Sequence, residues 1–212
     1  MISELRTVTE SGGSLPVLVW NLAVPMMAAS TAPSGGGLGL RHWVLNAQVA
    51  DDYGRCDPED HVAGLALGLG LSGPGVGMLT AADVTGARQA ADSRAEVEVT
   101  VGISLPTWAA APGETPGRKE APLGTINVVA FLPERLSDAA LLNALCTVTE
   151  AKAQALFDAG VKGTGTASDA VAILCLAAGP PHRFGGPRST WGSRLARAVH
   201  AAVLDGCTQG AR

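Results

Sequence analysis

The chain has 212 residues, of which 47% are hydrophobic and 16% charged, so it is not disordered and can bury a sizeable core. Its net charge of −4 is spread without a basic cluster, which argues against nucleic acid as a partner. The first residues lack a signal-peptide pattern, and the longest apolar stretches, 61–71 and 170–178, are too short to cross a bilayer. We therefore expect a cytoplasmic protein with no membrane partner.

In chain order, residues 15–24 form the first predicted strand, followed by a flexible glycine-rich loop over 30–37 and a second strand over 43–49. A helix begins after Asp57, which can cap it, with Pro58 at its first position, and runs to about residue 69. The glycines of 73–77 end this helix. Residues 78–84 are predicted to be extended.

In the second half, the alternation over 96–101 predicts a half-exposed strand. Residues 104–124 and 179–188 are rich in Pro and Gly and are predicted surface loops. Between them lie a strand over 125–132, a long helix over 137–159 ended by Gly160, and an apolar strand over 170–176. A final helix covers 189–204, with Trp191, Leu195, Val199 and Ala202 on one stripe.

These elements predict a single layered domain over residues 1–212, of the α/β or α+β class, with a mixed sheet packed by two or three helices. The two halves of the sequence also share one order of predicted elements. Each has a strand with an asparagine, then a helix, then a glycine turn with an Asp three residues after a Thr. The Thr–Asp pairs are Thr80 with Asp83 and Thr166 with Asp169. A duplicated strand-helix-strand unit would explain this shared order and would place both glycine turns at one cleft. The alternative is that the similarity arose by chance.

Four residues between the long helix and the last strand, Gly163, Thr164, Gly165 and Thr166, are the first candidate for a site. Glycines let backbone N–H groups approach a ligand, and threonines add hydroxyls, so the run could hold an oxyanion or a phosphate. It matches neither a Walker loop nor a dinucleotide fingerprint. From spacing alone, a tight turn is the stronger interpretation.

The long helix carries two further candidates. Lys152 falls within its apolar stripe, where it either extends to solvent or is held in a pocket and donates to a carbonyl or phosphate. Glu150 falls on the opposite side with Thr147 and Gln154, as a solvated acid would.

Other candidates for ligand contact are weaker. They are the glycines of two loops, whose default interpretation is a flexible loop or a tight turn, and two polar residues of the first half. These are Gly36, Gly37, Gly77, Asn46 and Thr80. The four cysteines and four histidines are scattered without metal-ligand spacing, so no metal site is predicted.

Taken in order, these segments resemble the adenosylcobinamide amidohydrolases of cobamide salvage. The matching segments are residues 35–37, 45–49, 53–58, 75–82, 126–129, 136–138, 149–153 and 163–166. The resemblance implies hydrolysis of the amide between a corrin propionate side chain and aminopropanol, which gives adenosylcobyric acid. The corrinoid would then be a substrate, and no cofactor is expected.

Amide hydrolysis requires a base, an oxyanion site and a proton for the leaving amine. We expect Glu150 or Asp169 to be the base, acting on water or on the hydroxyl of Thr166. Backbone N–H groups of residues 163–166 would bind the oxyanion, and Lys152 would orient the substrate or stabilise negative charge. In the family pattern an Asp follows the run directly, whereas Ala167 and Ser168 intervene here, which leaves the exact substrate open.

Two alternatives keep this fold. The chain could act on a different amide, ester or cyclising substrate in an accessory biosynthetic pathway, or it could bind corrinoids without catalysis. Low charge and Ala-rich helix faces would suit a homodimer.

Overall fold

The computed structural model describes residues 3–10, 13–112 and 124–209. Within them lie eight strands, three α-helices and one short 3-10 helix. The strands are β1 (Glu4–Glu10), β2 (Gly13–Ser30), β3 (Gly37–Gln48), β4 (Gly75–Thr80), β5 (Arg88–Asp92), β6 (Ala95–Val101), β7 (Ile126–Leu132) and β8 (Ala170–Cys175). The helices are α1 (Pro58–Gly68), η1 (Val84–Gly86), α2 (Asp138–Asp158) and α3 (Thr190–Gln209).

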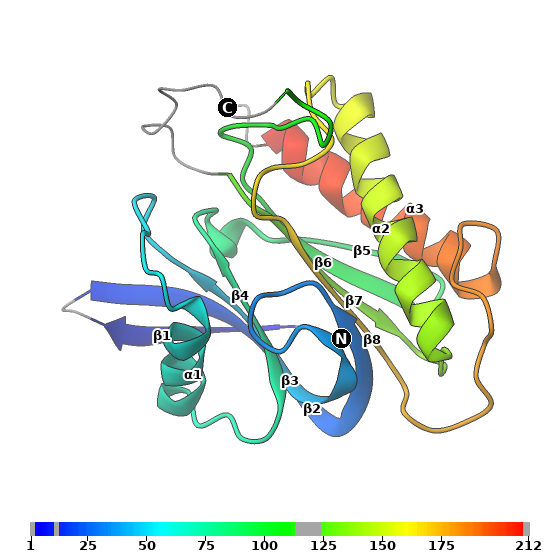
Figure 1. Ribbon diagram of the computed structural model, residues 1–212, viewed down its shortest axis with the longest axis horizontal. Helices are drawn as coiled ribbons and strands as arrows, with labels where there is room; N and C mark the ends of the chain where they lie inside the picture. The colour runs from blue at the N-terminus through cyan, green and yellow to red at the C-terminus, as the bar shows by residue number, and fades with distance from the viewer. Residues whose placement is uncertain (1–2, 11–12, 113–123, 210–212) are drawn as a thin grey trace.

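The described strands form one mixed sheet in the order β4-β3-β2-β8-β7-β6-β5, with β1 added to β2 (Figure 1). β2 joins the two halves of this sheet. Its first part pairs with β1 and β3, and its last part pairs with β3 and β8. Between them the register shifts, because Asn21 pairs with Trp43 and Met26 with Arg41. Such an irregularity bends a strand, so the sheet turns at this point.

Three hydrophobic clusters show how the layers are arranged. α1 covers one side of β2 and β3 and contributes Val62 and Leu65 to that cluster. α2 and α3 cover β5–β8 on the opposite side of the molecule (Figure 1). The third cluster lies between the two halves of the sheet and joins β2, β3 and β4 to β7 and β8. The chain is therefore a single α/β domain with a seam between two half-sheets.

Most predicted elements are confirmed. α2 begins where expected because the Ser137 hydroxyl accepts a hydrogen bond from the Ala140 N–H, and it ends before Gly160, whose φ of 74° favours glycine. Two predictions are wrong. Residues 78–84 are not continuously extended, because β4 ends at Thr80 and η1 follows. β6, predicted to be half-exposed, is buried over residues 97–100 because both faces of the sheet are covered there. Of the loop predicted over 104–124, residues 113–123 lie outside the described part.

Each half of the sheet contains one parallel β-α-β unit, β3-α1-β4 and β7-α2-β8. The duplicated strand-helix-strand pattern is thus present. The predicted correspondence between the two glycine turns is wrong, because they fall at different places relative to the strands. Gly75 and Gly77 lie inside β4, whereas Gly163 and Gly165 precede β8. Thr80 therefore closes a strand, while Asp169 comes just before one begins. The two predicted turns are not equivalent.

Candidate active site

A cavity of about 220 Å³ lies across the seam, where β3 and β4 end and β7 and β8 begin. Its walls are mostly apolar, with a few polar groups among them. That combination is typical of small-molecule sites. The lining residues are Pro33, Val49, Ala50, Asp51, Tyr53, Pro58, Leu79, Thr80, Ala81, Thr125, Ser168 and Ala170.

Two buried asparagines, one from each β-α-β unit, join the halves beside the cavity. The Asn127 Nδ2 donates to the Asn46 Oδ1 at 2.9 Å and to the Leu79 carbonyl at 3.1 Å. The Asn127 Oδ1 accepts from the Ala170 N–H at 3.2 Å. Asn46 in turn donates to the Thr100 hydroxyl at 2.9 Å. The Asn46 amide is 1% exposed and bonded on both sides, so it supports the cavity wall from within the protein.

We predict that Asn127→Ala lowers the free energy of unfolding by about 2–4 kcal/mol, because the Asn46 amide oxygen, the Leu79 carbonyl and the Ala170 N–H each lose a hydrogen bond. Urea denaturation followed by circular dichroism measures the change. Asn143→Ala is the matched control, since Asn143 is exposed on α2 and should cost no more than about 0.5 kcal/mol. Equal stability of the two variants would show that the Asn46–Asn127 link contributes little.

The segment before β8 is anchored by Asp169. Its carboxylate pairs with the Lys152 ammonium and accepts hydrogen bonds from the Thr166 hydroxyl, the Thr166 N–H at 3.1 Å and the Ile126 N–H at 2.9 Å. The side chains of Lys152 and Asp169 are 8% and 11% exposed. Lys152 is thus held inside the protein and does not extend to solvent. Three of the four predicted catalytic residues meet at this anchor.

The glycines of residues 163–166 make room for this anchor. A Cβ on Gly165 would overlap the Asp169 carboxylate and the Lys152 ammonium. A Cβ on Gly163 would come within 3.0 Å of Pro106 and of the Thr107 backbone, which pairs with the run through the Thr107 N–H and carbonyl. The Thr164 hydroxyl accepts from the Ala109 N–H at 3.0 Å. The run is a packed turn that positions Ser168 at the cavity.

Four polar side chains that sequence reasoning did not select face the cavity: Asp51, Tyr53, Thr125 and Ser168. The hydroxyls of Thr125 and Ser168 are hydrogen-bonded at 2.7 Å. Asp51 is exposed and is the one carboxylate among the described residues of the lining. Burial raises the pKa of Tyr53 above its usual value, so its phenol keeps its proton at neutral pH. The sequence offered one signal for Tyr53, namely its position in the segment 53–58, which matches the family pattern.

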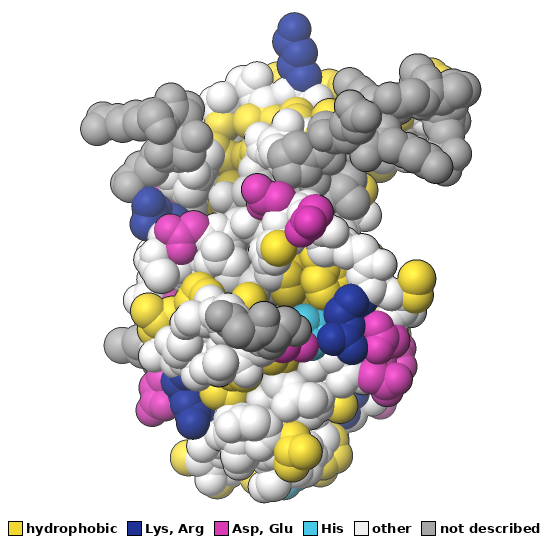
Figure 2. Space-filling view, turned by 90° about the vertical axis from the view of Figure 1, so that its left-hand side faces the viewer, with side chains coloured by type: hydrophobic (Ala, Val, Ile, Leu, Met, Phe, Trp, Pro, Cys, Tyr) yellow, Lys and Arg dark blue, Asp and Glu magenta, His cyan; other side chains and the backbone are white. Residues whose placement is uncertain are grey.

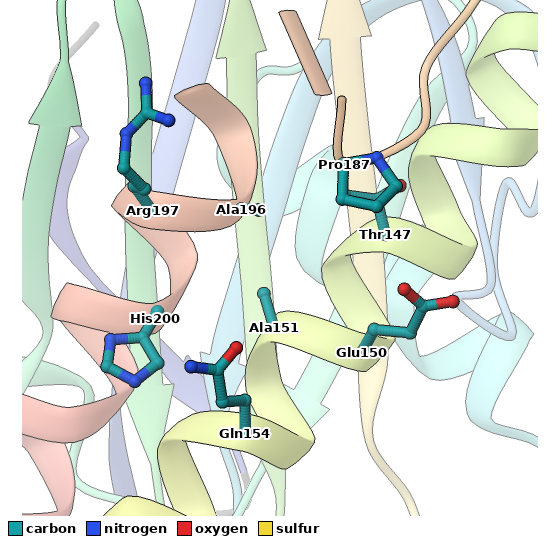
Figure 3. Close-up of a pocket in the computed structure, with 8 residues that line it drawn as sticks. All are labelled: Thr147, Glu150, Ala151, Gln154, Pro187, Ala196, Arg197 and His200. Atoms are coloured by element: carbon teal, nitrogen blue, oxygen red, sulfur yellow. The ribbon is translucent and has the colours of Figure 1, made fainter. Parts of the chain in front are cut away.

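Glu150 lies elsewhere. It is exposed on α2 and lines a second cavity of about 270 Å³, to which α3 contributes Arg197 and His200 (Figure 3). Thr147, expected beside Glu150 on a solvated face, is buried, and its hydroxyl donates to the Gly185 carbonyl at 2.9 Å. The structure therefore does not bring Glu150 together with Lys152, Thr166 and Asp169.

We expect Glu150→Gln to retain amide-hydrolysis activity within about twofold of the unchanged protein, because Glu150 faces a cavity remote from the seam. The comparison needs initial rates at several substrate concentrations for both proteins. A loss of about 100-fold, the size expected for a general base, would instead move the active site to the α2–α3 cavity.

Two of the other three predicted ligand-binding glycines make close packing contacts. A Cβ on Gly77 would overlap Val62 of α1, and a Cβ on Gly36 would approach the Ala32 carbonyl to 2.5 Å. Gly37 has a φ of 79° at the start of β3. None of the three is among the described residues that line the seam cavity, whereas Thr80 is. Their contact with a ligand stays a prediction.

In the described ranges, no group of three or more His, Cys, Asp or Glu side chains is placed to hold a metal ion. No helix there is long and apolar enough to cross a membrane.

Comparison with known proteins adds independent information. The family model described as adenosylcobinamide amidohydrolase matches residues 2–211. A protein of that name from Methanosarcina mazei is 28% identical over 188 residues, which cover 84% of this chain and 88% of that protein. Another from Halobacterium salinarum is 33% identical over 192 residues, which cover 87% of this chain and 82% of that protein.

Together, the fold and these relatives define an α/β enzyme of the amidohydrolase class. The chain belongs to the adenosylcobinamide amidohydrolase family.

Proposed function

We propose that this enzyme hydrolyses the aminopropanol amide of adenosylcobinamide and releases adenosylcobyric acid for corrinoid salvage. The observation that carries the proposal is the seam cavity, where a carboxylate and a phenol face apolar walls. Its volume of about 220 Å³ is below the range of about 300–1,000 Å³ that whole drug-sized ligands occupy. Only the amide arm of the substrate would therefore enter, while the corrin ring stays outside.

In this proposal Asp51 is the general base and takes a proton from the attacking water. The water oxygen bonds to the amide carbon, and the oxyanion accepts a hydrogen bond from the Ser168 or Thr125 hydroxyl. Tyr53 then donates its proton to the amine nitrogen as the C–N bond breaks. Lys152, Asp169 and Thr166 act as positioning residues, because their contacts hold Ser168 in place.

The test is incubation of the purified protein with adenosylcobinamide, followed by mass spectrometry for free aminopropanol and adenosylcobyric acid. Both products should appear in equal amounts. Binding of the corrinoid without release would favour a corrinoid carrier. If neither occurs, the chain acts on a different amide, ester or cyclising substrate.

A further inference from the structure

A histidine that the mechanism above does not use connects Tyr53 to the protein surface. His61 on α1 is 4% exposed, and its ring stacks on the ring of Tyr53 with centroids 5.5 Å apart. Its Nδ1 is 2.9 Å from the Tyr53 hydroxyl, and its Nε2 is 2.8 Å from a carboxylate oxygen of Glu10 on β1. Glu10, which is 51 residues from His61 in the sequence, thus joins His61 and Tyr53 in one hydrogen-bonded chain.

The two ends of this hydrogen-bonded chain lie in different cavities. Tyr53 lines the seam cavity, whereas His61 and Glu10 line a separate hollow of about 300 Å³ between β1 and α1. Figure 2 looks onto the side of the molecule that carries the tips of β1 and β2, where basic and acidic side chains lie close together. The chain therefore links a surface hollow to the cavity through a buried imidazole.

The protonation state of His61 decides where the Tyr53 proton points. In the neutral ring, Glu10 accepts the Nε2 proton, so Nδ1 accepts the Tyr53 O–H and turns that proton away from the cavity. In the imidazolium, Nε2 donates to Glu10 and Nδ1 donates to the Tyr53 oxygen. The Tyr53 proton is then available to the cavity.

Several charged groups surround His61. Glu10 bonds it directly, Asp60 lines the same hollow, and Asp57 is near enough for its charge to interact with His61. Arg55 opposes them, but it is itself paired with Asp57 at 2.8 Å and with Glu10 at 3.3 Å. Burial raises the pKa of Tyr53, and this keeps its proton in place until the amine nitrogen takes it.

We propose that Glu10, His61 and Tyr53 form a proton wire in which His61, held by Glu10, resupplies Tyr53 with a proton as Tyr53 protonates the leaving amine. The inference rests on the proposed amide hydrolysis. As the C–N bond breaks, the Tyr53 proton passes to the amine nitrogen, and the Nδ1 proton of His61 passes to the Tyr53 oxygen. The neutral ring keeps its Nε2 proton on Glu10 and regains a proton at Nδ1 through the Tyr53 hydroxyl from water in the cavity, while Asp51 releases the proton taken from the attacking water. The enzyme returns to its starting state with no net gain or loss of protons.

Tyr53 would be the catalytic residue of the wire, and His61 and Glu10 its positioning residues. Tyr53→Phe should lower kcat about 100-fold or more with little change in KM. In the unchanged protein, kcat should fall as pH rises and His61 loses its proton. Glu10→Gln keeps an acceptor for Nε2 but removes the charge that stabilises the imidazolium. The pH at which kcat falls should therefore move lower in that variant.

A second readout needs no substrate. Tyr53 is the single tyrosine of the sequence, so protein grown with tyrosine labelled with ¹³C only at Cζ gives one ring-carbon resonance. This resonance should show a step between about pH 5 and 8, where histidine titrates. The step should move to lower pH in Glu10→Gln and vanish in His61→Gln. Asp158→Asn is the matched control, because it alters another histidine–carboxylate pair, His200 with Asp158 at 2.8 Å, and should change neither readout.

The two proposals fail in different ways. Turnover of adenosylcobinamide together with a flat Tyr53 resonance, or a Glu10→Gln profile identical to that of the unchanged protein, would overturn the wire. A pH-dependent Tyr53 resonance without turnover would support the link between Tyr53 and His61 and reject adenosylcobinamide as the substrate.

Discussion

Asp169→Ala is expected to lower the free energy of unfolding by about 3–5 kcal/mol, because it leaves the Lys152 ammonium buried without its partner. The Lys152 side chain is only 8% exposed, and the Thr166 hydroxyl and the Ile126 N–H lose an acceptor as well. Urea unfolding at neutral pH, followed by circular dichroism, measures the loss.

A double variant separates the buried charge from the rest of the anchor. Asp169→Leu combined with Lys152→Met removes both charges and should recover part of the stability lost by Asp169→Ala, since a buried ion pair can often be replaced by apolar side chains. A loss below about 1 kcal/mol in Asp169→Ala would contradict the anchoring role, because the expected penalty for an unpaired buried charge is several times larger.

Asp51→Asn is expected to lower kcat by about 100-fold to 10,000-fold, because it removes the proposed general base while keeping the size of the side chain. Asp51 is exposed after the end of β3, so the fold should be unaffected. Initial rates of aminopropanol release, measured with substrate in excess, test the expectation.

The neighbouring acid supplies the control for this variant. Asp52 is also exposed but is not among the described residues that line the seam cavity. Asp52→Asn should therefore keep the rate of the unchanged protein. If Asp51→Asn and Asp52→Asn have equal rates, another group activates the water.

The interior of this fold was predictable because its elements have strong local signals. The Ser137 cap and the apolar stripe around Lys152 locate α2, and apolar runs locate β7 and β8. β1 and β5 were missed, since both are edge strands in which polar and partly exposed residues dominate. Edge strands need no continuous apolar pattern, so their sequences resemble loops.

The candidate site was only partly predictable, for a different reason. Lys152, Thr166 and Asp169 lie close in sequence and meet as one anchor. Tyr53 lies in a loop and lacks periodicity, and its link to Glu10 through His61 depends on β1 packing beside α1. Local patterns carry no information on such long-range contacts. The helical wheel placed Glu150 correctly on the exposed side of α2, but it could not show that α3 packs beside that side and forms a second cavity there.

The position of the cavity on the seam ties activity to the last stage of folding. Asn46 and Asn127 are 81 residues apart, and β2 belongs to both half-sheets, so neither β-α-β unit can build the pocket without the other. Contacts between segments so distant in sequence form slowly. Catalysis should therefore appear later than helix content during refolding, and a small separation of the halves should inactivate the enzyme well before it unfolds.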